Sequence, residues 1–573
     1  AAMSTDDLLD EYKKERSNYA ETVLFQMGRY LLLSSSRDSL PANLQGIWND
    51  SNSPGWNSDY HFNVNLQMNY WPAFVTDMSE TAMPLVNYMD SLRNPGNVTA
   101  REHFGVEDGW VVNTEANPFG KTAPGSAFSW GFTPGSGAWT CQNLWDYYEF
   151  TGDPEVLEKI YPILREGAEF WLGYMVEDPR TRTEGVEGTG ELVTAPGGSS
   201  EHGPVGVGTT YDMSLAYMEM QNTAKAAKIL GVDEGLQTQI QGALSRMKPF
   251  WIGTDGQLKE WREETGYSSM PGTEKLHRHL SHLLGLHPGN LITKEGGEFS
   301  EYYDAAVRAL ELRDDGSSAV GWSMAQKGNI FARVGDGEKA LHHMNLLLTE
   351  GLGDNLLDVY VHPSWGDIFQ VEANMGYTAG VAEMLLQSHQ GFIEPLPALP
   401  KAWADGSYTG LVARGNYKTD AVWHDSHLEK FVVRSTNGGE CIVRYPNISK
   451  ATLSGGTFTV IDVDTVKIDT VKGGEYVFEN IPARKSVEEI KVESESGITL
   501  LEKAGQSIAL TADVLPEDAD NKAVTWKVTD ENGGATECVT IDENGVLTAT
   551  DKLALQNVKV TATAKDGSDV SGE

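Results

Sequence analysis

The chain has 573 residues, a length that exceeds one ordinary core and indicates about three or four domains. Its 44 Lys and Arg residues face 82 Asp and Glu residues, and the formal charge of −38 repels nucleic acid phosphates and anionic membranes. No apolar run reaches the roughly 18 to 20 residues that a membrane-spanning helix needs. Cys141, Cys441 and Cys538 lie too far apart for a zinc site or a disulfide framework. We therefore expect no nucleic acid partner and no membrane insertion.

Helical periodicity dominates the chain up to about residue 390. Apolar residues recur at positions i, i+3, i+4 and i+7, which predicts about a dozen amphipathic helices. The clearest segments are residues 18–35, 144–150, 154–175, 213–230, 236–251, 301–312, 324–334, 338–348 and 378–389. Long loops rich in Gly, Pro and Trp separate them, whereas the loops of helical bundles usually have about 2 to 8 residues. This spacing favours a closed ring of helical hairpins.

Short alternating runs replace the helices after the turn-rich segment 395–407. They predict antiparallel strands, as in YTGLVARG, LEKFVVRS and ECIVRYP. Composition changes again near residue 487, where Val- and Thr-rich runs alternate with Gly, Asn and Asp turns, as in a β-sandwich. We expect a multidomain, mainly α protein: a helical domain over residues 1–395, a small antiparallel β-domain over 396–487 and a β-sandwich over 488–573.

Side chains that can carry chemistry gather in five loops of the helical part. The first loop holds Asn63 and Asn65, and the strand-like alternation of HFNVNL would point both amides the same way unless they only satisfy loop backbone. The second presents Glu201 between helices, although a loop Glu is usually just solvated. In the third, the His-x-His-x-x-His spacing of residues 277–282 is similar to a metal site. No matching fourth ligand is evident there, so we expect a polar wall instead.

The last two loops add further aromatic, amide and carboxylate side chains. One contains His362 and Glu372, and the other contains Asn113 and Glu115, followed by Trp139. This mixture suits a neutral polyol, because aromatic faces cover C–H groups while amides and carboxylates bind hydroxyls. An uncharged sugar also agrees with the acidic surface, which a phosphorylated or sulfated substrate would oppose. The residues favour a sugar-binding site without a metal or a cofactor.

Long strings of the helical part resemble glycoside hydrolase family 95. They include GRYLLLSSSRDSLPANLQGIWND, NVNLQMNYWPA, HRHLSHLLGLHPGN and GWSMAQKGNIFARV, and the resemblance covers about residues 1–445. It implies an (α/α)6 barrel followed by a small β-domain, whereas the family's leading β-sandwich has no counterpart in this sequence. It also implies the inverting removal of a terminal α-L-fucose, typically α-1,2-linked to galactose, from a fucosylated oligosaccharide or a glycoprotein glycan.

The resemblance also implies roles for individual residues. Glu201 takes the place of the general acid, although Gly197 and Ser200 break the family's Pro-Ser-x-Ser-Pro pattern. Asn63 and Asn65 match the pair that positions the attacking water, and Asn65 resembles the amide that takes its proton. The residues implied to bind the glycone are Arg278, His279, His362, Trp139, Asn113 and Glu115.

The carboxylate behind the amide is where the sequence departs from the family. The family string Phe-Gln-Ile-Asp-Gly-Asn-Phe-Gly becomes FQVEANMG, so Glu372 stands in place of Asp. Inversion needs an acid and a base on opposite sides of the sugar, and a neutral amide is a poor base unless a carboxylate accepts from its NH2 group. We expect Glu372 either to support Asn65 in this way or to reach the water itself.

Two other functions stay open because such departures fall at the site. One is an exo-glycosidase for another α-linked sugar, such as an α-L-galactosidase, and the other is a carbohydrate-binding protein that lost its base at Glu372. The strings AGQSIALTADVLPEDADNKAVTWKV and IDENGVLTAT resemble bacterial Ig-like domains of the second group, which are usually spacers in exported proteins. We therefore expect a secreted or cell-surface bacterial protein whose signal peptide lies upstream of the printed sequence.

Overall fold

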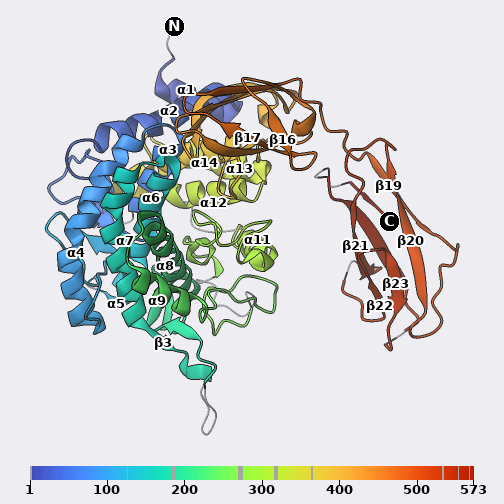
Figure 1. Cartoon of the computed structure of the whole chain (residues 1–573), viewed down its shortest axis with the longest axis horizontal. Coiled ribbons are helices and arrows are strands. Elements are labelled where there is room, and N and C mark those ends of the chain that lie inside the picture. Colours follow the sequence, from blue (N-terminus) through green and yellow to red (C-terminus); the bar gives the residue numbers. More distant parts are fainter. Residues whose placement is uncertain are drawn as a thin grey trace. The chain divides into compact units, whose positions relative to one another are not determined.

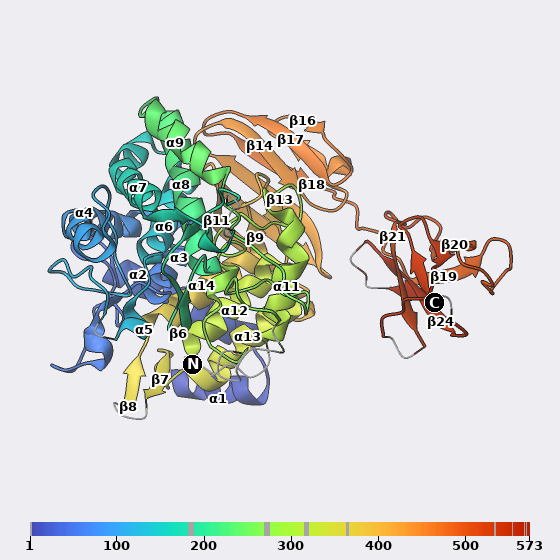
Figure 2. The same cartoon turned by 90° about the horizontal axis from the view of Figure 1, so that it is seen from below.

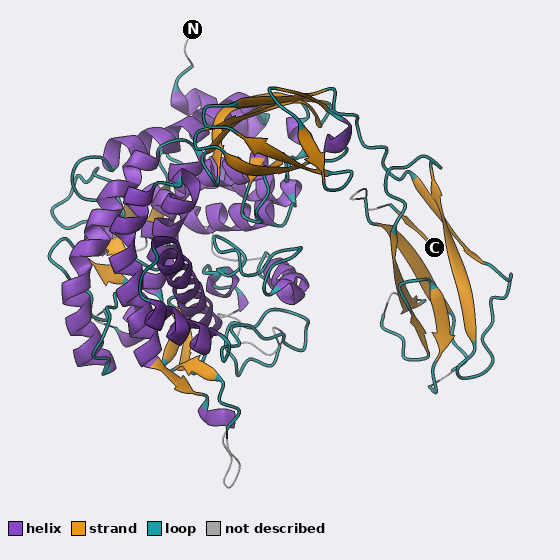
Figure 3. Ribbon diagram, viewed as in Figure 1, coloured by secondary structure: helices purple, strands orange, loops and turns teal. Residues whose placement is uncertain are grey.

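A computed structural model describes residues 3–573, except residues 126, 182–187, 267, 269–274, 315–319, 363–365, 532–533, 553, 567 and 569. It divides into two compact units. Residues 1–445 and 452–480 form the first, and residues 446–451 and 481–573 form the second. Helices dominate the first unit up to residue 385, and strands dominate the rest of the chain (Figures 1 and 3). Within the described residues, no helix combines the length and apolar character needed to cross a membrane.

The helices of the first unit form a ring of two layers, which confirms the expected (α/α)6 barrel. The inner layer contains α3 (Asn65–Val75), α6 (Ser136–Thr151), α8 (Thr210–Leu230), α12 (Gly321–Arg333) and α14 (Val371–Leu385). The outer layer contains α2 (Asn18–Ser35), α4 (Met83–Phe104), α7 (Pro154–Tyr174), α9 (Glu234–Leu244), α11 (Tyr303–Leu312) and α13 (Gly337–Leu346). The helices α1 (Thr5–Lys14) and α5 (Phe128–Gly131) flank the ring. Figure 2 shows α4, α7 and α9 outside α6 and α8.

Burial explains the two layers. Every residue of α12 is buried, and α14 is buried except at one position, so both are surrounded by protein on all sides. The inner helices pack in the order α12, α14, α3, α6 and α8. Between α8 and α12 the ring continues through residues 277–292, where a short 3-10 turn, Ser281–Leu283, packs on α8. The ring therefore closes although one inner position lacks a long helix.

Local sequence signals set the helix ends. At the junction between α6 and α7, Gly152 adopts a left-handed φ of 61° that glycine tolerates, and α6 ends there. Asp153 then accepts a hydrogen bond from the Glu155 backbone N–H at 2.9 Å, and Pro154 occupies the first position of α7. Three consecutive residues thus stop one helix and start the next.

The amino-terminal ends of the inner helices meet at one end of the ring. Asn65 begins α3 and donates to Glu372 in the first turn of α14. The backbone N–H of Gly135, just before α6, donates to Asp212 in the first turn of α8 at 3.0 Å. Because helix amino termini carry partial positive charge, this end of the ring favours carboxylates.

The opposite end of the ring is covered by the small β-domain (Figure 3). Its strands are β11 (Gly406–Ala413), β12 (Tyr417–His424), β13 (His427–Ser435), β14 (Gly439–Arg444), β15 (Thr452–Ser454), β16 (Phe458–Val460), β17 (Thr465–Thr470) and β18 (Glu475–Glu479). They form antiparallel sheets in the orders β11-β12-β13-β18-β15 and β14-β17-β16. Arg414, directly after β11, pairs with Asp146 at 2.8 Å and Glu149 at 2.9 Å near the carboxyl end of α6. These ion pairs join the domain to the ring.

Short hairpins in the ring loops carry the residues of interest. The strands are β1 (Tyr60–His61), β2 (Glu115–Ala116), β3 (Met175–Glu177), β4 (Leu192–Thr194), β5 (Gly197–Ser199), β6 (His202–Gly206), β7 (Val359–His362), β8 (Gly366–Phe369), β9 (Leu386–Gln387) and β10 (Glu394–Pro395). The expected strand across Asn63 and Asn65 is wrong, because β1 ends at His61 and Asn65 already lies in α3. The two amides therefore do not share a strand face.

The second unit contains two antiparallel sheets. The first has the order β19-β20-β23-β22 and the second has the order β21-β24-β25. The strands are β19 (Glu489–Ser494), β20 (Ser507–Leu515), β21 (Val524–Asp530), β22 (Val539–Ile541), β23 (Val546–Ala549), β24 (Val558–Ala564) and β25 (Ser571–Gly572). Ile490, Val514 and Ala562 are buried between them. This arrangement confirms the expected β-sandwich.

Candidate active site

Glu201 lies at the turn between β5 and β6, with a φ of 60° and a side chain that is 12% exposed. Its Oε1 accepts a hydrogen bond from Asn63 Nδ2 at 2.7 Å and lies 3.6 Å from His61 Nε2. Its Oε2 is paired with Arg278 and lies 3.3 Å from His279 Nε2. Four side chains from two loops thus surround one carboxyl group.

These neighbours set the charge of Glu201. Burial alone would raise the pKa of its carboxyl, but His279, His61 and Arg278 together hold the pKa well below its usual range. The His61 ring also contacts Asp59 at 3.0 Å, and although burial opposes its charge, Asp59 and Glu201 raise its pKa to about 10. The free protein therefore holds an ionised Glu201 beside a cationic His61.

Sequence reasoning did not identify His61 as a site residue. It lies two positions before Asn63, in the loop that the sequence already marked as rich in amides. The usable signal was the Asp59-x-His61 spacing, since a carboxylate can bind one ring nitrogen and leave the other for a second acid.

Asn65 and Glu372 form the second carboxylate centre. Asn65 Nδ2 donates to Glu372 Oε1 at 2.5 Å, and both side chains are buried. Burial raises the pKa of Glu372 to about 7, against the lowering effect of its own backbone N–H and of Asn65. Within the described part of the chain, Glu372 Oε2 has no hydrogen-bond partner. Glu372 thus reaches the amide directly despite its additional methylene.

A further carboxyl, Asp358, lies close enough to Glu372 for the charge of Glu372 to affect the pKa of Asp358. Asp358 is fully buried, and burial followed by the charge of Glu372 raises its pKa well above the ordinary value. Its backbone N–H donates to Asn374 Oδ1 at 2.9 Å, which connects the segment before β7 to α14. Neither carboxyl oxygen has a hydrogen-bond partner among the described residues.

Arg278 and His279 are held in place from α12. Ser323 Oγ donates to the Arg278 carbonyl at 2.9 Å, and the His279 ring lies 4.5 Å from that of Trp322. The amino terminus of α12 therefore fixes the segment that supplies two of the side chains around Glu201. The structure brings these two predicted residues to the general-acid candidate.

The other four predicted sugar-binding residues lie in different surroundings. Trp139 is 1% exposed, contacts Tyr211 edge-on at 6.2 Å and leaves Nε1 without a partner among the described residues. Asn113 is fully buried, and its amide donates to the Thr122 carbonyl and accepts from the Thr133 N–H, both at 3.1 Å. Its amide thus supports loop backbone.

Glu115 and His362 occupy the edges of the site loops. Glu115 pairs with Lys121 and lies opposite His61 in the β1–β2 register. The His362 ring lies 5.7 Å from Trp56 and 5.8 Å from Tyr360, and all three residues are half-buried. Their part in sugar binding stays a prediction.

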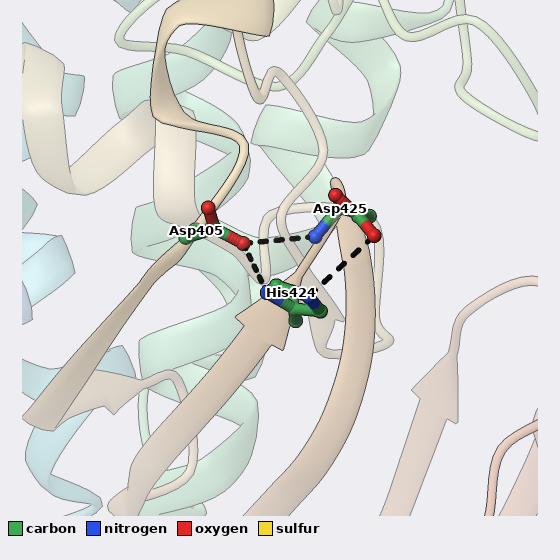
Figure 4. Close-up of side chains that lie close together, drawn as sticks. All are labelled: Asp405, His424 and Asp425. Carbon is green, nitrogen blue, oxygen red and sulfur yellow. Dashed lines mark hydrogen bonds and ion pairs between the residues drawn. The ribbon is translucent and has the colours of Figure 1, made fainter.

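The histidines of segment 277–282 face carboxylates and rings. His277 stacks on His202 at 3.8 Å, and His282 Nδ1 lies 3.6 Å from Glu260 Oε2. Among the described residues, the one group with metal-ligand spacing is Asp405, His424 and Asp425 in the β-domain (Figure 4). All three are exposed and already contact one another.

Models of known families match the whole arrangement. The glycosyl hydrolase family 95 catalytic domain matches residues 1–385, and the family 95 C-terminal domain matches residues 387–478. The chain belongs to glycoside hydrolase family 95. A bacterial Ig-like domain of group 2 matches residues 486–573 of this family 95 protein.

Named relatives of this family 95 protein come from fungi and plants. It is 33% identical to a probable alpha-fucosidase A of Aspergillus niger, covering 74% of this chain and 54% of the relative. It is 35% identical to alpha-L-fucosidase 2 of Arabidopsis thaliana, covering 80% and 55%. The chain thus spans about half the length of these relatives. An alpha-L-rhamnosidase structure from Streptomyces avermitilis aligns with a TM-score of 0.41 and 14% identity, covering 74% of this chain and 38% of that one.

Proposed function

We propose that the protein hydrolyses terminal α-linked L-fucose from glycans with inversion, the preferred linkage being α-1,2 to galactose. The names of the Aspergillus and Arabidopsis relatives support the sugar. The observation that carries the mechanism is the 2.5 Å hydrogen bond from Asn65 Nδ2 to Glu372 Oε1, since an amide can serve as a base only with a carboxylate behind it. The substrate is a fucosylated oligosaccharide or a glycoprotein glycan.

On the base side, Asn65 binds the attacking water through its carbonyl oxygen. The water oxygen forms a bond to the anomeric carbon while its proton moves toward Asn65. Charge that develops on the amide is stabilised by Glu372, whose burial strengthens the electrostatic interaction. Because Glu372 is fully buried behind the amide, it acts through Asn65.

On the acid side, Glu201 gives its proton to the glycosidic oxygen as the bond from that oxygen to the anomeric carbon breaks. The products are the free sugar with inverted configuration and the released glycan. One proton leaves Glu201 and one is gained at Asn65, so proton exchange with solvent restores the starting state.

Protonation of Glu201 must accompany substrate binding, because the cations around it keep it ionised in the free protein. An uncharged leaving-group oxygen that displaces Arg278 from Glu201 Oε2 removes one of these cations and raises the pKa of the carboxyl. Arg278 and His279 are then free to bind hydroxyl groups of the sugar. His362, Trp139 and Glu115 complete the glycone site in this proposal, and Asn113 supports it from behind.

Export accompanies this function. The Ig-like domain supports a secreted or cell-surface location, where fucosylated glycans are accessible.

The experiment uses a fucosyl-α-1,2-galactoside and the matching L-galactosyl compound. Proton NMR during the first minutes identifies the released sugar and its anomer, and β-L-fucose is the expected product. Glu201→Gln should lower turnover by ~100- to 10,000-fold with the folded state intact. Release of L-galactose alone selects the related glycosidase, and tight binding without release selects a binding protein. Near wild-type turnover in Glu201→Gln would refute the acid assignment.

A further inference from the structure

The backbone at Glu201 is in a conformation that requires support. Its φ of 60° lies in the left-handed region, which is strained for a residue with a side chain. Such a conformation persists only where neighbouring contacts hold it. The strand residues that border the turn, Ser199 at the end of β5 and His202 at the start of β6, are the natural places for such contacts.

Glu260 holds both of these flanking residues. Its Oε1 accepts a short hydrogen bond from Ser199 Oγ and lies 2.8 Å from His202 Nε2. Glu260 comes from the loop before α11, so one side chain bridges both strands of the hairpin from outside it. Its side chain is 1% exposed, so these contacts with the hairpin are shielded from water.

The other oxygen of Glu260 is fixed by cationic and imidazole groups. Arg313 Nη2 donates to Oε2 at 2.5 Å, and His282 Nδ1 lies 3.6 Å away. Although burial opposes ionisation, His202, Arg313 and His282 hold the pKa of Glu260 well below its usual range. A buried carboxylate with charged partners on one side makes strong, directional hydrogen bonds on the other.

We infer that Glu260 is a positioning residue for the general acid: through Ser199 and His202 it fixes the strained turn that aims the Glu201 carboxyl at the leaving oxygen. The inference rests on the proposed function of Glu201. Glu260 reaches Glu201 through Ser199 and His202 and, from its other oxygen, through Arg313, which donates to the His279 carbonyl at 3.2 Å. Both routes act on the orientation of the acid, so the base side, Asn65 and Glu372, should stay unchanged.

Two substrates with different leaving groups can distinguish a positioning role of Glu260 from a general role in stability. A nitrophenolate leaves without a proton, whereas a sugar hydroxyl needs the general acid. Glu260→Gln should therefore lower kcat/KM for a fucosyl-α-1,2-galactoside by ~100-fold, the typical cost of misplacing a catalytic group by about 1 Å. The same variant should lower kcat/KM for 4-nitrophenyl α-L-fucoside by less than ~5-fold, because no proton is needed.

Two further variants keep the test decisive. Ser199→Ala removes one of the two contacts without changing charge, and it should show the same selective loss to a smaller degree. Glu264→Gln is the matched control, since Glu264 lies four residues away and accepts from the Glu260 N–H at 2.8 Å and from Gln257. It should change both substrates equally.

The outcomes distinguish this inference from the proposed function. Hydrolysis of both substrates by the wild type, with equal losses or no loss in Glu260→Gln, would overturn the positioning role alone. If the wild type hydrolyses neither of the two substrates, the proposed function is overturned. If Glu260→Gln does not fold, the ratio of the two activities in Ser199→Ala decides the question.

Discussion

Asn65 and Glu372 lie 307 positions apart in the chain, yet their side chains share a hydrogen bond of 2.5 Å. The bond joins the first turns of α3 and α14, which are neighbours in the inner layer. Two helices must therefore hold their relative height within a fraction of an ångström for the amide to keep its carboxylate. Any change in the reach of residue 372 acts directly on this contact.

Shortening residue 372 is expected to reduce activity, although it introduces the residue that the family pattern has. Glu372→Asp withdraws the carboxylate by about 1.5 Å, the length of one C–C bond, and leaves the Asn65 NH2 group unbound. We expect kcat to fall by ~10- to 100-fold, measured with the fucosyl-α-1,2-galactoside. Glu372→Gln is the control that keeps the reach and removes the charge, and wild-type kcat in both variants would contradict the role of the pair.

The pH dependence of kcat/KM should report Glu372. The reacting form needs a proton on Glu201 and none on Glu372, whereas the free protein favours the opposite arrangement. Because the pKa of Glu201 lies below that of Glu372, the fraction of protein in the reactive form is constant between the two pKa values. Above the pKa of Glu372, near pH 7, this reactive fraction falls tenfold per pH unit, because Glu372 is then fully ionised and Glu201 continues to lose its proton.

The measurement for this prediction is a kcat/KM profile from pH 4 to 9. We expect the decline to begin near pH 7 and to shift when Glu372 is replaced by Asp. A profile that stays flat to pH 9 would contradict the low pKa that the neighbouring side chains give Glu201 in the free protein.

Gly203 should not tolerate a side chain. Its φ is +70°, and an added Cβ would lie 2.0 Å from Trp261 Cζ2, the ring that packs against His202. Gly203→Ala should lower stability by ~1–3 kcal/mol and reduce hydrolysis of the sugar glycoside, as measured by thermal unfolding and kcat/KM. Gly206→Ala on the same strand is the control, since its nearest neighbour, Glu263 Oε2, lies 3.6 Å away. Equal effects of the two substitutions would argue against the fit at Gly203.

Glu219 should make the stability of the helical unit fall as pH rises. It is buried in α8 and accepts from Trp171 Nε1 at 2.7 Å, and burial raises its pKa to about 7. The folded state binds this proton at pH values where the unfolded chain, with a pKa of about 4.3, has lost it. Between pH 4 and 8 the difference destabilises the folded state by up to about 3 kcal/mol.

Glu219→Gln removes this dependence because the amide does not ionise. Calorimetry at pH 5 and pH 8 should show a smaller loss of thermal stability in the variant than in the wild type. Glu158→Gln, at an exposed position of α7, is the matched control and should leave the pH dependence unchanged. A wild-type loss retained in Glu219→Gln would assign it to another buried acid.

The sequence predicted helices well where apolar residues recur regularly. The segment 18–35 coincides with α2, and segment 154–175 coincides with α7 to within one residue. It did not identify α4, whose interior contains Pro95 and Gly96, because these residues normally interrupt a helical pattern. It also predicted a strand across Asn63, because a short alternating run such as HFNVNL cannot distinguish a strand from the turn that precedes a helix.

Within the site, sequence and structure contributed different kinds of information. The sequence by itself determined the family, the domain types and the polar residues that line the loops, because these depend on composition, periodicity and local strings. Only the tertiary structure decided that Asn63 binds Glu201 while Asn65 binds Glu372, and that Asn113 serves loop backbone. It also decided that His61 lies beside the acid and that Glu260 binds the two strands that border it. The physical reason is that hydrogen bonds between side chains require separations within a few tenths of an ångström. Such separations between residues far apart in the chain are set by how the inner helices pack.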